Sequence, residues 1–402
     1  MKDQFVVPAR LKTTSFVLMG IGLLTLLIGL FAFQGEQGST RFWAGLLQNS
    51  TFFMLIVLAS TFFIAATTLA HGGWQIGFRR VPEAISMAVP ILGGILFIIL
   101  MILVFTDKTN IYHWLDAEHV KHDPILNWKA PFLSKSFFTT ATVITIALWS
   151  FFTWKLRQMS IEEDGWDLSA ATGKKIVWRN TVWCGGFLVV FVLSVGSTTP
   201  WMWLMSIDAH WYSTMYSWYT FASTWVSGAA LISLFVIYLK RNGYLPNVNE
   251  EHLHDLGKFC FAFSIFWTYL WFSQYMLIWY ANMPEEIVYF KPRVWGEWRP
   301  IFFLNLVINF ITPLLFLMKR DTKRSYSAMV FIAVVIIFGH WLDFWEMVGP
   351  GTYHHLIFPW FEFGIGLGFV GLIIYLVSNN LTKASLVPKN HPYLKESIVH
   401  HT

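Results

Sequence analysis

The sequence predicts an all-α polytopic membrane protein with about ten transmembrane helices, and three observations support this prediction. Of the 402 residues, 55% are hydrophobic and only 13% are charged, whereas soluble domains carry about 25% charged residues. Phenylalanine, tryptophan and tyrosine make up 18% of the chain, which is typical of aromatic belts at the two membrane surfaces. Apolar runs of about twenty residues, the length that spans a bilayer as a helix, recur along the whole chain.

The apolar runs follow one another with polar connections. The predicted helices are 12–33, 51–71, 86–106, 136–155, 180–200, 216–240, 256–281, 301–318, 326–348 and 356–378. We expect a single membrane domain over residues 1–402, in which the last part, 379–402, is a cytoplasmic tail. Within it, 51–200 and 216–348 are expected to form two four-helix bundles, and 12–33 and 356–378 are expected to be peripheral helices.

The basic residues indicate how these helices are oriented. With the N-terminus in the cytoplasm, 20 of the 28 Lys and Arg residues fall on the cytoplasmic side, and eight fall in the outer segments 34–50, 107–135 and 282–300. This bias predicts that both termini are cytoplasmic. The inner loop 156–179, acidic and then basic, is expected to be a solvated crossover. The formal charge of +5 does not indicate nucleic acid as a partner, because the basic residues lie between apolar runs.

Ionisable side chains occupy the last third of the apolar run 326–348. At about 100° per residue, His340, Asp343 and Glu346 share one arc of the predicted helix. Each such group costs about 2.5–3.5 kcal/mol on insertion scales, so it usually faces a protein interior or a water path. The sequence Gly349-Pro350-Gly351 then predicts the end of the helix.

Two interpretations of this arc stay open. In one, His340 and Asp343 form a buried hydrogen-bonded pair that holds helices together. In the other, they handle protons where a membrane-soluble substrate is oxidised or reduced. Further polar residues at a similar outer depth on neighbouring helices favour the second interpretation. These additional candidates are Gln274, Tyr275, Asn305 and Glu362.

Hydroxyl groups in the inner halves of the helices predict a proton path. Ser264 and Thr268 lie within about 40° of Tyr275 on the predicted helix 256–281, and His71 ends the helix 51–71 near the inner surface. Hydroxyls both donate and accept hydrogen bonds, so with intervening waters they can relay a proton. The alternative, in which they bond to carbonyls one turn back, stays open.

Redox centres are expected to lie outside this chain. Its two cysteines, Cys184 and Cys260, are too few for an iron–sulfur cluster, which usually needs four thiolates. The sequence contains no CxxCH motif for covalent haem. We therefore expect no metal site and no covalently bound cofactor.

Three stretches carry a resemblance to a known family: Ser206–Tyr216, Phe272–Glu286 and Gly339–Thr352. Together they resemble the second large membrane subunit of bacterial alternative complex III, which belongs to the NrfD/PsrC-like family of integral membrane subunits. The similarity covers most of the chain from the predicted helix 180–200 onward, and the Ser-Gln-Tyr…Asn…Pro-Glu-Glu pattern in Phe272–Glu286 is its most specific part.

The resemblance implies a membrane subunit of the bacterial inner membrane that takes part in quinol:cytochrome c or quinol:oxidase electron transfer. Its implied partners are a paralogous NrfD-like membrane subunit, an iron–sulfur subunit and cytochrome c subunits with haem c. Quinol, in the form of menaquinol or a related molecule, would be oxidised near the outer face, and the bundles would conduct protons. Such a chain would not be catalytic alone. The alternatives are a non-redox scaffold subunit of that complex and a secondary transporter.

Overall fold

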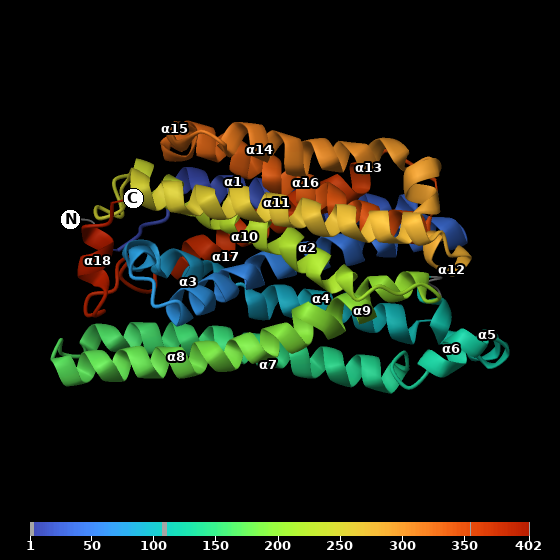
Figure 1. Cartoon of the computed structure of the whole chain (residues 1–402), viewed down its shortest axis with the longest axis horizontal. Helices are drawn as coiled ribbons and strands as arrows, with labels where there is room; N and C mark the ends of the chain where they lie inside the picture. Colours follow the sequence, from blue (N-terminus) through green and yellow to red (C-terminus); the bar gives the residue numbers. More distant parts are fainter. Residues whose placement is uncertain (1–3, 107–110, 354, 402) are drawn as a thin grey trace.

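The computed structural model describes residues 4–106, 111–353 and 355–401, and these residues form helices joined by turns, with no strand among them (Figure 1). The chain is an all-α polytopic membrane protein. In the described ranges, nine helices are long and apolar enough to cross a membrane. The predicted run 256–281 is also helical, within α11 (Glu250–Ala281). That helix does not meet the same hydropathy requirement, since it is rich in Trp, Tyr and polar side chains.

Most of the length of the protein is built from long helices. They are α1 (Ala9–Ala32), α2 (Gly35–Leu69), α4 (Val89–Phe105), α7 (Lys135–Glu162), α8 (Ala170–Leu193), α10 (Met215–Arg241), α11, α16 (Tyr326–Thr352) and α17 (Trp360–Leu381). A further span is composite, and consists of α13 (Arg299–Leu306), a π-helical turn at Val307–Ile311 and α14 (Thr312–Leu317). The short helices are α3 (Arg80–Ser86), α5 (Ala117–His122), α6 (Pro124–Lys129), α9 (Thr199–Trp203), α12 (Pro284–Ile287), α15 (Arg320–Arg324) and α18 (Leu394–Ile398).

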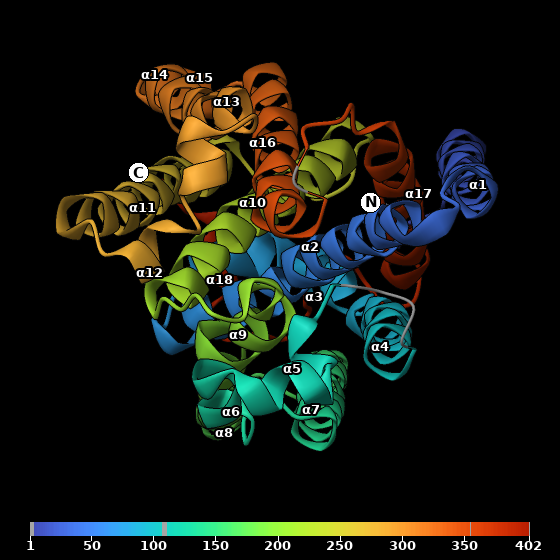
Figure 2. The same cartoon turned by 90° about the vertical axis from the view of Figure 1, so that its right-hand side faces the viewer.

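Two helices, α2 and α10, occupy the centre of the molecule and contact each other (Figure 2). On one side, α2 packs against α4 and α8, and α7 packs against both α4 and α8. On the other side, α10 packs against α11 and α16, which also contact the composite span of α13 and α14. Helices α16 and α17 both contact α2, so this helix joins the two sides.

The first two helices are joined by a tighter turn than the sequence predicts. The sequence predicts an outer segment, 34–50, before a helix that starts at residue 51, but α2 begins at Gly35, whose φ of 78° lets the chain reverse directly after α1. From Thr40 to Ser50 most residues of α2 are buried. Arg41 is among them because it pairs with the buried Glu362 of α17 at 3.2 Å. The predicted start of this helix at residue 51 was therefore wrong, because the helix begins sixteen residues earlier, at Gly35.

Helix α1 contacts α17 through glycines. A Cβ atom added at Gly22 would lie 2.4 Å from the Cα of Gly368, and one added at Gly364 would lie 2.3 Å from the Oγ1 of Thr25. In lipid the hydrophobic effect does little to hold two helices together, so they associate mainly by van der Waals packing. Small residues increase this packing because they let the two helical backbones approach closely. The peripheral position of α1 thus depends on residues without side chains.

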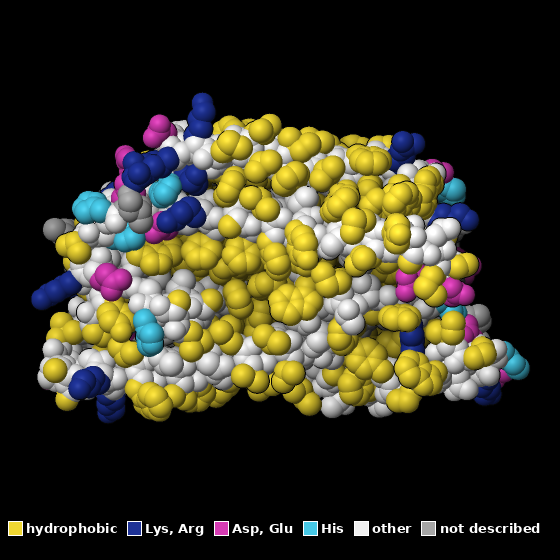
Figure 3. Space-filling model, viewed as in Figure 1, with side chains coloured by type: hydrophobic (Ala, Val, Ile, Leu, Met, Phe, Trp, Pro, Cys, Tyr) yellow, Lys and Arg dark blue, Asp and Glu magenta, His cyan; other side chains and the backbone are white. Residues whose placement is uncertain are grey.

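Charged side chains gather at the two ends of the molecule, and hydrophobic side chains cover the surface between them (Figure 3). Both termini lie at one of these ends, which we call the terminal end (Figure 1). The tail is packed there: the Ser397 hydroxyl donates to the Trp74 carbonyl at 2.7 Å and accepts from the Gly77 amide at 2.9 Å. His400 Nε2 lies 2.7 Å from the Asp255 carboxylate at the start of α11.

Candidate functional site

The three ionisable residues of α16 share one buried face. His340 and Asp343 are fully buried, and Glu346 is 4% exposed. Their side chains contact α10, α11 and α13, as the partners described below show. The spacing of three residues places them one above another on that face, with Glu346 furthest from the terminal end.

Asp343 accepts hydrogen bonds from two helices. The Tyr219 hydroxyl of α10 donates to one carboxylate oxygen, and the Trp267 indole of α11 donates to the other at 3.0 Å. His340 Nδ1 lies 3.7 Å from Asp343 and 3.0 Å from the Ser223 hydroxyl. His340 Nε2 has no hydrogen-bond partner in the described part of the chain. Asp343 is therefore the central acceptor of a small buried network.

Glu346 is the member of this group that lies furthest from the terminal end. The Asn305 amide of α13 donates to its carboxylate. Arg293 donates to the backbone carbonyl of Glu346 at 3.2 Å and to that of Met347 at 3.1 Å. The Arg293 guanidinium also lies 3.5 Å from the centre of the Tyr289 ring. These contacts attach the end of α16 to the outer segment 282–300.

The same arginine explains why α16 does not end where the sequence predicts. Proline has no N–H, so Pro350 cannot bond to the carbonyl of Glu346 one turn back. Arg293 donates to that carbonyl instead, and α16 continues to Thr352. The predicted helix end at Gly349 was therefore wrong by one turn, because a side chain replaces the missing backbone donor.

A small cavity lies beside Glu346. Its volume is about 20 Å³, measured as the space open to the centre of a water molecule. Its polar lining includes Tyr219, Gln274, Tyr289, Arg293 and Glu346, and Gln274 Nε2 has no partner among the described residues. A polar space of at least about 10–15 Å³ on this measure holds a water molecule. The cavity can therefore hold water between Gln274 and Glu346, but it is too small for a quinol ring.

The remaining outer candidates lie in different places. Gln274 and Asn305 join Glu346, as described. Tyr275 is half-buried, and its ring packs against Phe290 and Phe302. Glu362 pairs with Arg41, and its carbonyl accepts a hydrogen bond from Asn49 at 3.0 Å. Asn49 in turn accepts a hydrogen bond from the Trp341 indole at 2.9 Å. Glu362 is therefore linked to the face of α16 that carries Trp341, and not to the face that carries Asp343.

The hydroxyls of the predicted proton path are not joined to one another by the hydrogen bonds of the described residues. Thr268 donates to the Ser264 carbonyl at 2.8 Å, and the Ser264 hydroxyl has no partner within those residues. His71 is exposed in the turn that follows α2, in a left-handed conformation with φ of 51°. The path remains a prediction that would need waters between these groups.

Sequence reasoning missed the partners supplied by α10 and by the outer segment. Tyr219 and Ser223 lie four residues apart within an apolar run, so they share a helical face. This polar pair could have been identified by its spacing. Arg293 and Trp267 had no comparable signal, because an arginine near a predicted surface and a tryptophan in a membrane helix are both common.

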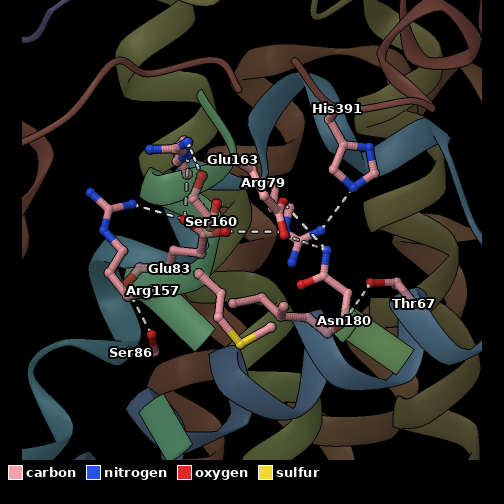
Figure 4. A network of polar contacts seen from close by, with 12 residues as sticks. Thr67, Arg79, Glu83, Ser86, Arg157, Ser160, Glu163, Asn180 and His391 are labelled. Atoms are coloured by element: carbon pink, nitrogen blue, oxygen red, sulfur yellow. Dashed lines mark hydrogen bonds and ion pairs between the residues drawn. The ribbon is translucent and has the colours of Figure 1, made fainter. Parts of the chain in front are cut away.

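A second buried polar group lies at the terminal end (Figure 4). Glu83 of α3 is 1% exposed and contacts three arginines. The distances from its carboxylate are 3.0 Å to Arg79, 3.5 Å to Arg80 and 3.0 Å to Arg157 of α7. Arg79 also donates to His391 of the tail at 3.2 Å. This network joins α3, α7 and the C-terminal tail.

The network corrects the expectation for the loop 156–179. The loop is not a solvated crossover throughout, because Arg157 and Glu163 are buried. Arg179 and Asn180 donate to Glu163, each at 3.1 Å. The turn between α7 and α8 spans only residues 163–169, so most of the predicted loop is helical. The charged residues Arg157, Glu163 and Arg179 therefore form ion pairs within the protein instead of a solvated surface.

The described part of the chain has no cluster of candidate metal ligands. Among its residues, no three His, Cys, Asp or Glu side chains come together as metal ligands. Cys184 and Cys260 are each buried and unbonded. The two cysteines therefore do not provide the four thiolates that an iron–sulfur cluster usually needs.

The fold and its buried groups define a multi-pass, all-α membrane protein with acids and a histidine enclosed between its helices. Comparison of the sequence with models of protein families and with curated proteins finds no match.

Proposed function

We propose that this chain is an integral membrane subunit of a quinol-oxidising electron-transfer complex in the bacterial inner membrane, and that the α16 group accepts protons from quinol. The observation that carries this proposal is the position of Glu346 beside a cavity that can hold water, with Asp343 one turn below it. The sequence resemblance to the membrane subunits of alternative complex III supports the same function.

In this proposal, the electrons and the protons released by quinol oxidation go to different subunits. Oxidation of a quinol to a quinone releases two protons and two electrons. The electrons pass to an iron–sulfur subunit and then to cytochrome c subunits or an oxidase, because the two cysteines of this chain are too few for an iron–sulfur cluster of its own. The protons need bases within reach of water, and ionised carboxylates accept them.

The contacts around α16 indicate which of its acids would receive a proton first. Among the described residues, the Glu346 carboxylate accepts one side-chain hydrogen bond, from Asn305, which leaves acceptor capacity toward the cavity. Tyr219 both lines this cavity and donates to Asp343. A proton arriving through water would therefore reach Glu346 first, and the Tyr219 hydroxyl would connect the cavity to Asp343 and His340.

A scaffold role is the second candidate, and one observation favours it. Both oxygens of Asp343 are already occupied by donors, from Tyr219 and Trp267. Such an arrangement fixes α10, α11 and α16 together without any proton transfer. The chain would then anchor its partner subunits, while quinol would react on the paralogous membrane subunit.

Replacement of Glu346 by glutamine separates these functions. The substitution Glu346→Gln keeps the size and removes the base, and the exposed Glu285→Gln provides the same chemical change as a control. With all partner subunits coexpressed, we expect quinol-dependent electron flux to fall about 100-fold or more in Glu346→Gln, in the range for loss of a general base. The partners should still copurify. Normal flux with normal assembly would contradict proton acceptance, and loss of assembly in Glu346→Gln alone would support the scaffold.

A further inference from the structure

A deep apolar groove lies on the membrane-facing surface between α10, α16 and α17. Its volume is about 720 Å³, within the range of about 300–1,000 Å³ that is usual for ligand pockets. Phe53 and Ile56 of α2 also line the groove, and so does Leu11 of α1. Its lining is almost entirely apolar, so the occupant must be apolar over most of its length.

The length of the groove matches one leaflet of a bilayer. Its lining runs from Leu231 to Asn242 on α10 and from Val330 to Trp341 on α16. At 1.5 Å per residue, each of these stretches covers about 16 Å. Half of a hydrocarbon core of about 30 Å is about 15 Å. The groove therefore has the length of one leaflet and runs from the terminal end of α10 toward the middle of that helix, which suits an acyl chain.

A polar pocket adjoins the end of the groove nearest the termini. Arg241 lines both spaces, and Lys240, Arg324 and Glu250 line the polar pocket with it. Arg324 is already paired with Glu251. Lys240 and Arg241 have no carboxylate within 4 Å in the described part of the chain, since Arg241 bonds to the Ser327 hydroxyl and Lys240 to backbone carbonyls.

From these observations we infer that the groove and the adjoining pocket form a binding site for one anionic phospholipid of the leaflet on the terminal side. The phosphate lies at Lys240 and Arg241, and the acyl chains extend along α10 and α16 toward Trp341. This inference is independent of the function proposed above, because no residue of the α16 acid group takes part.

The charges favour an anionic lipid over a zwitterionic one. With Arg324 neutralised by Glu251, the positive charges of Lys240 and Arg241 exceed the negative charge of Glu250 by one. A headgroup with a single net negative charge, such as phosphatidylglycerol, compensates this excess. Its hydroxyls can also donate to Glu250. A phosphatidylcholine headgroup carries no net charge and offers no hydroxyl donor.

The first test measures lipid retention by the full-length chain in detergent, using native mass spectrometry with phosphatidylglycerol or phosphatidylcholine. We expect one phosphatidylglycerol to be retained in preference to phosphatidylcholine. In Lys240→Gln/Arg241→Gln this preference should fall roughly 5- to 30-fold, as expected for two cations near an anionic lipid. The control Lys174→Gln/Lys395→Gln removes two exposed cations elsewhere at the terminal end and should retain the preference. Equal loss in both double variants would overturn the inference.

The second test fills the groove itself. Val334 of α16 lines the groove and is 53% exposed, so Val334→Trp adds bulk there without disturbing the protein interior. Val189 of α8 is 61% exposed on another membrane face, and Val189→Trp is the matched control. Retention of phosphatidylglycerol should fall in Val334→Trp only. Unchanged retention in Val334→Trp would contradict the site, as would displacement of the lipid by an equimolar quinone, which would assign the groove to a quinone tail.

Discussion

The Tyr219 hydroxyl of α10 donates a hydrogen bond to the Asp343 carboxylate of α16, and the same tyrosine lines the cavity beside Glu346. One tyrosine of α10 thus contacts Asp343 and lines the same cavity as Glu346, the next buried acid of α16. The stability of the α10–α16 contact therefore depends in part on this hydroxyl group.

We therefore expect Tyr219→Phe and Asp343→Asn to be energetically coupled. Each change removes part of a buried hydrogen bond and should destabilise the protein by about 1–3 kcal/mol. In the double variant the losses should not add, with a coupling of about 0.5–3 kcal/mol. Equilibrium unfolding in detergent measures this cycle. As a control, Tyr219→Phe combined with Glu162→Gln should be additive, because Glu162 pairs with Arg179 at the terminal end. Additivity in the first pair would contradict the coupling.

The network around Glu83 predicts a large difference in stability between substitutions of two glutamates, Glu83 and Glu162, which are both paired with arginine. Glu83→Gln should destabilise the protein by about 3–5 kcal/mol, because it leaves buried arginines without a compensating charge. Glu162→Gln should cost less than about 1 kcal/mol, since the Glu162 side chain is half exposed and contacts only Arg179 among the ion pairs described. Thermal unfolding of the two purified variants provides the comparison. Similar melting temperatures would show that the Glu83 network contributes little.

His391 predicts a pH dependence that originates outside the membrane-spanning helices. Burial, together with the positive charges of Arg79 and Arg80, lowers the pKa of His391 from 6.5 to about 3. Below its ordinary pKa the unfolded chain binds a proton at this residue, but the folded protein does not. The contribution of His391 to stability is therefore fully present above about pH 6.5, and it falls as the pH drops toward 3, by up to about 1.4 kcal/mol per pH unit.

The melting temperature of the protein should accordingly be lower at pH 5 than at pH 7.5. In His391→Gln, which keeps an acceptor for Arg79 but does not titrate, this difference should become smaller. The exposed His401→Gln should leave it unchanged. The same pH dependence in all three proteins would mean that other groups determine it.

Two glycines of α1 predict opposite effects of the same substitution. Gly22→Ala places a methyl group 2.4 Å from the Gly368 Cα and should separate α1 from α17, with a clear fall in melting temperature. At Gly20 an added Cβ meets no atom within 4 Å, so Gly20→Ala should be neutral or should stabilise α1 by up to about 1 kcal/mol through helix propensity. Equal melting temperatures of the two variants would exclude close packing at Gly22.

The sequence was sufficient to predict the class of fold. Hydrophobic runs of membrane-spanning length become helices because the bilayer offers no other partner for their backbone groups. It also predicted that His340, Asp343 and Glu346 share a face, since helical periodicity fixes this locally. Its main error in the helices concerned their ends, where Arg293 extends α16 and where α2 begins directly after α1.

What only the tertiary structure decided is which side chains those faces meet. Glu362 and Asp343 were expected at similar depth, yet Glu362 pairs with Arg41 and Asp343 meets Tyr219 and Trp267. The Glu83 network could not be inferred either, because its members come from α3, α7 and the tail. Periodicity along one helix determines the direction of a side chain relative to its neighbours in sequence. The rotation of each helix, and hence the partner across the interface, is set by packing against the others.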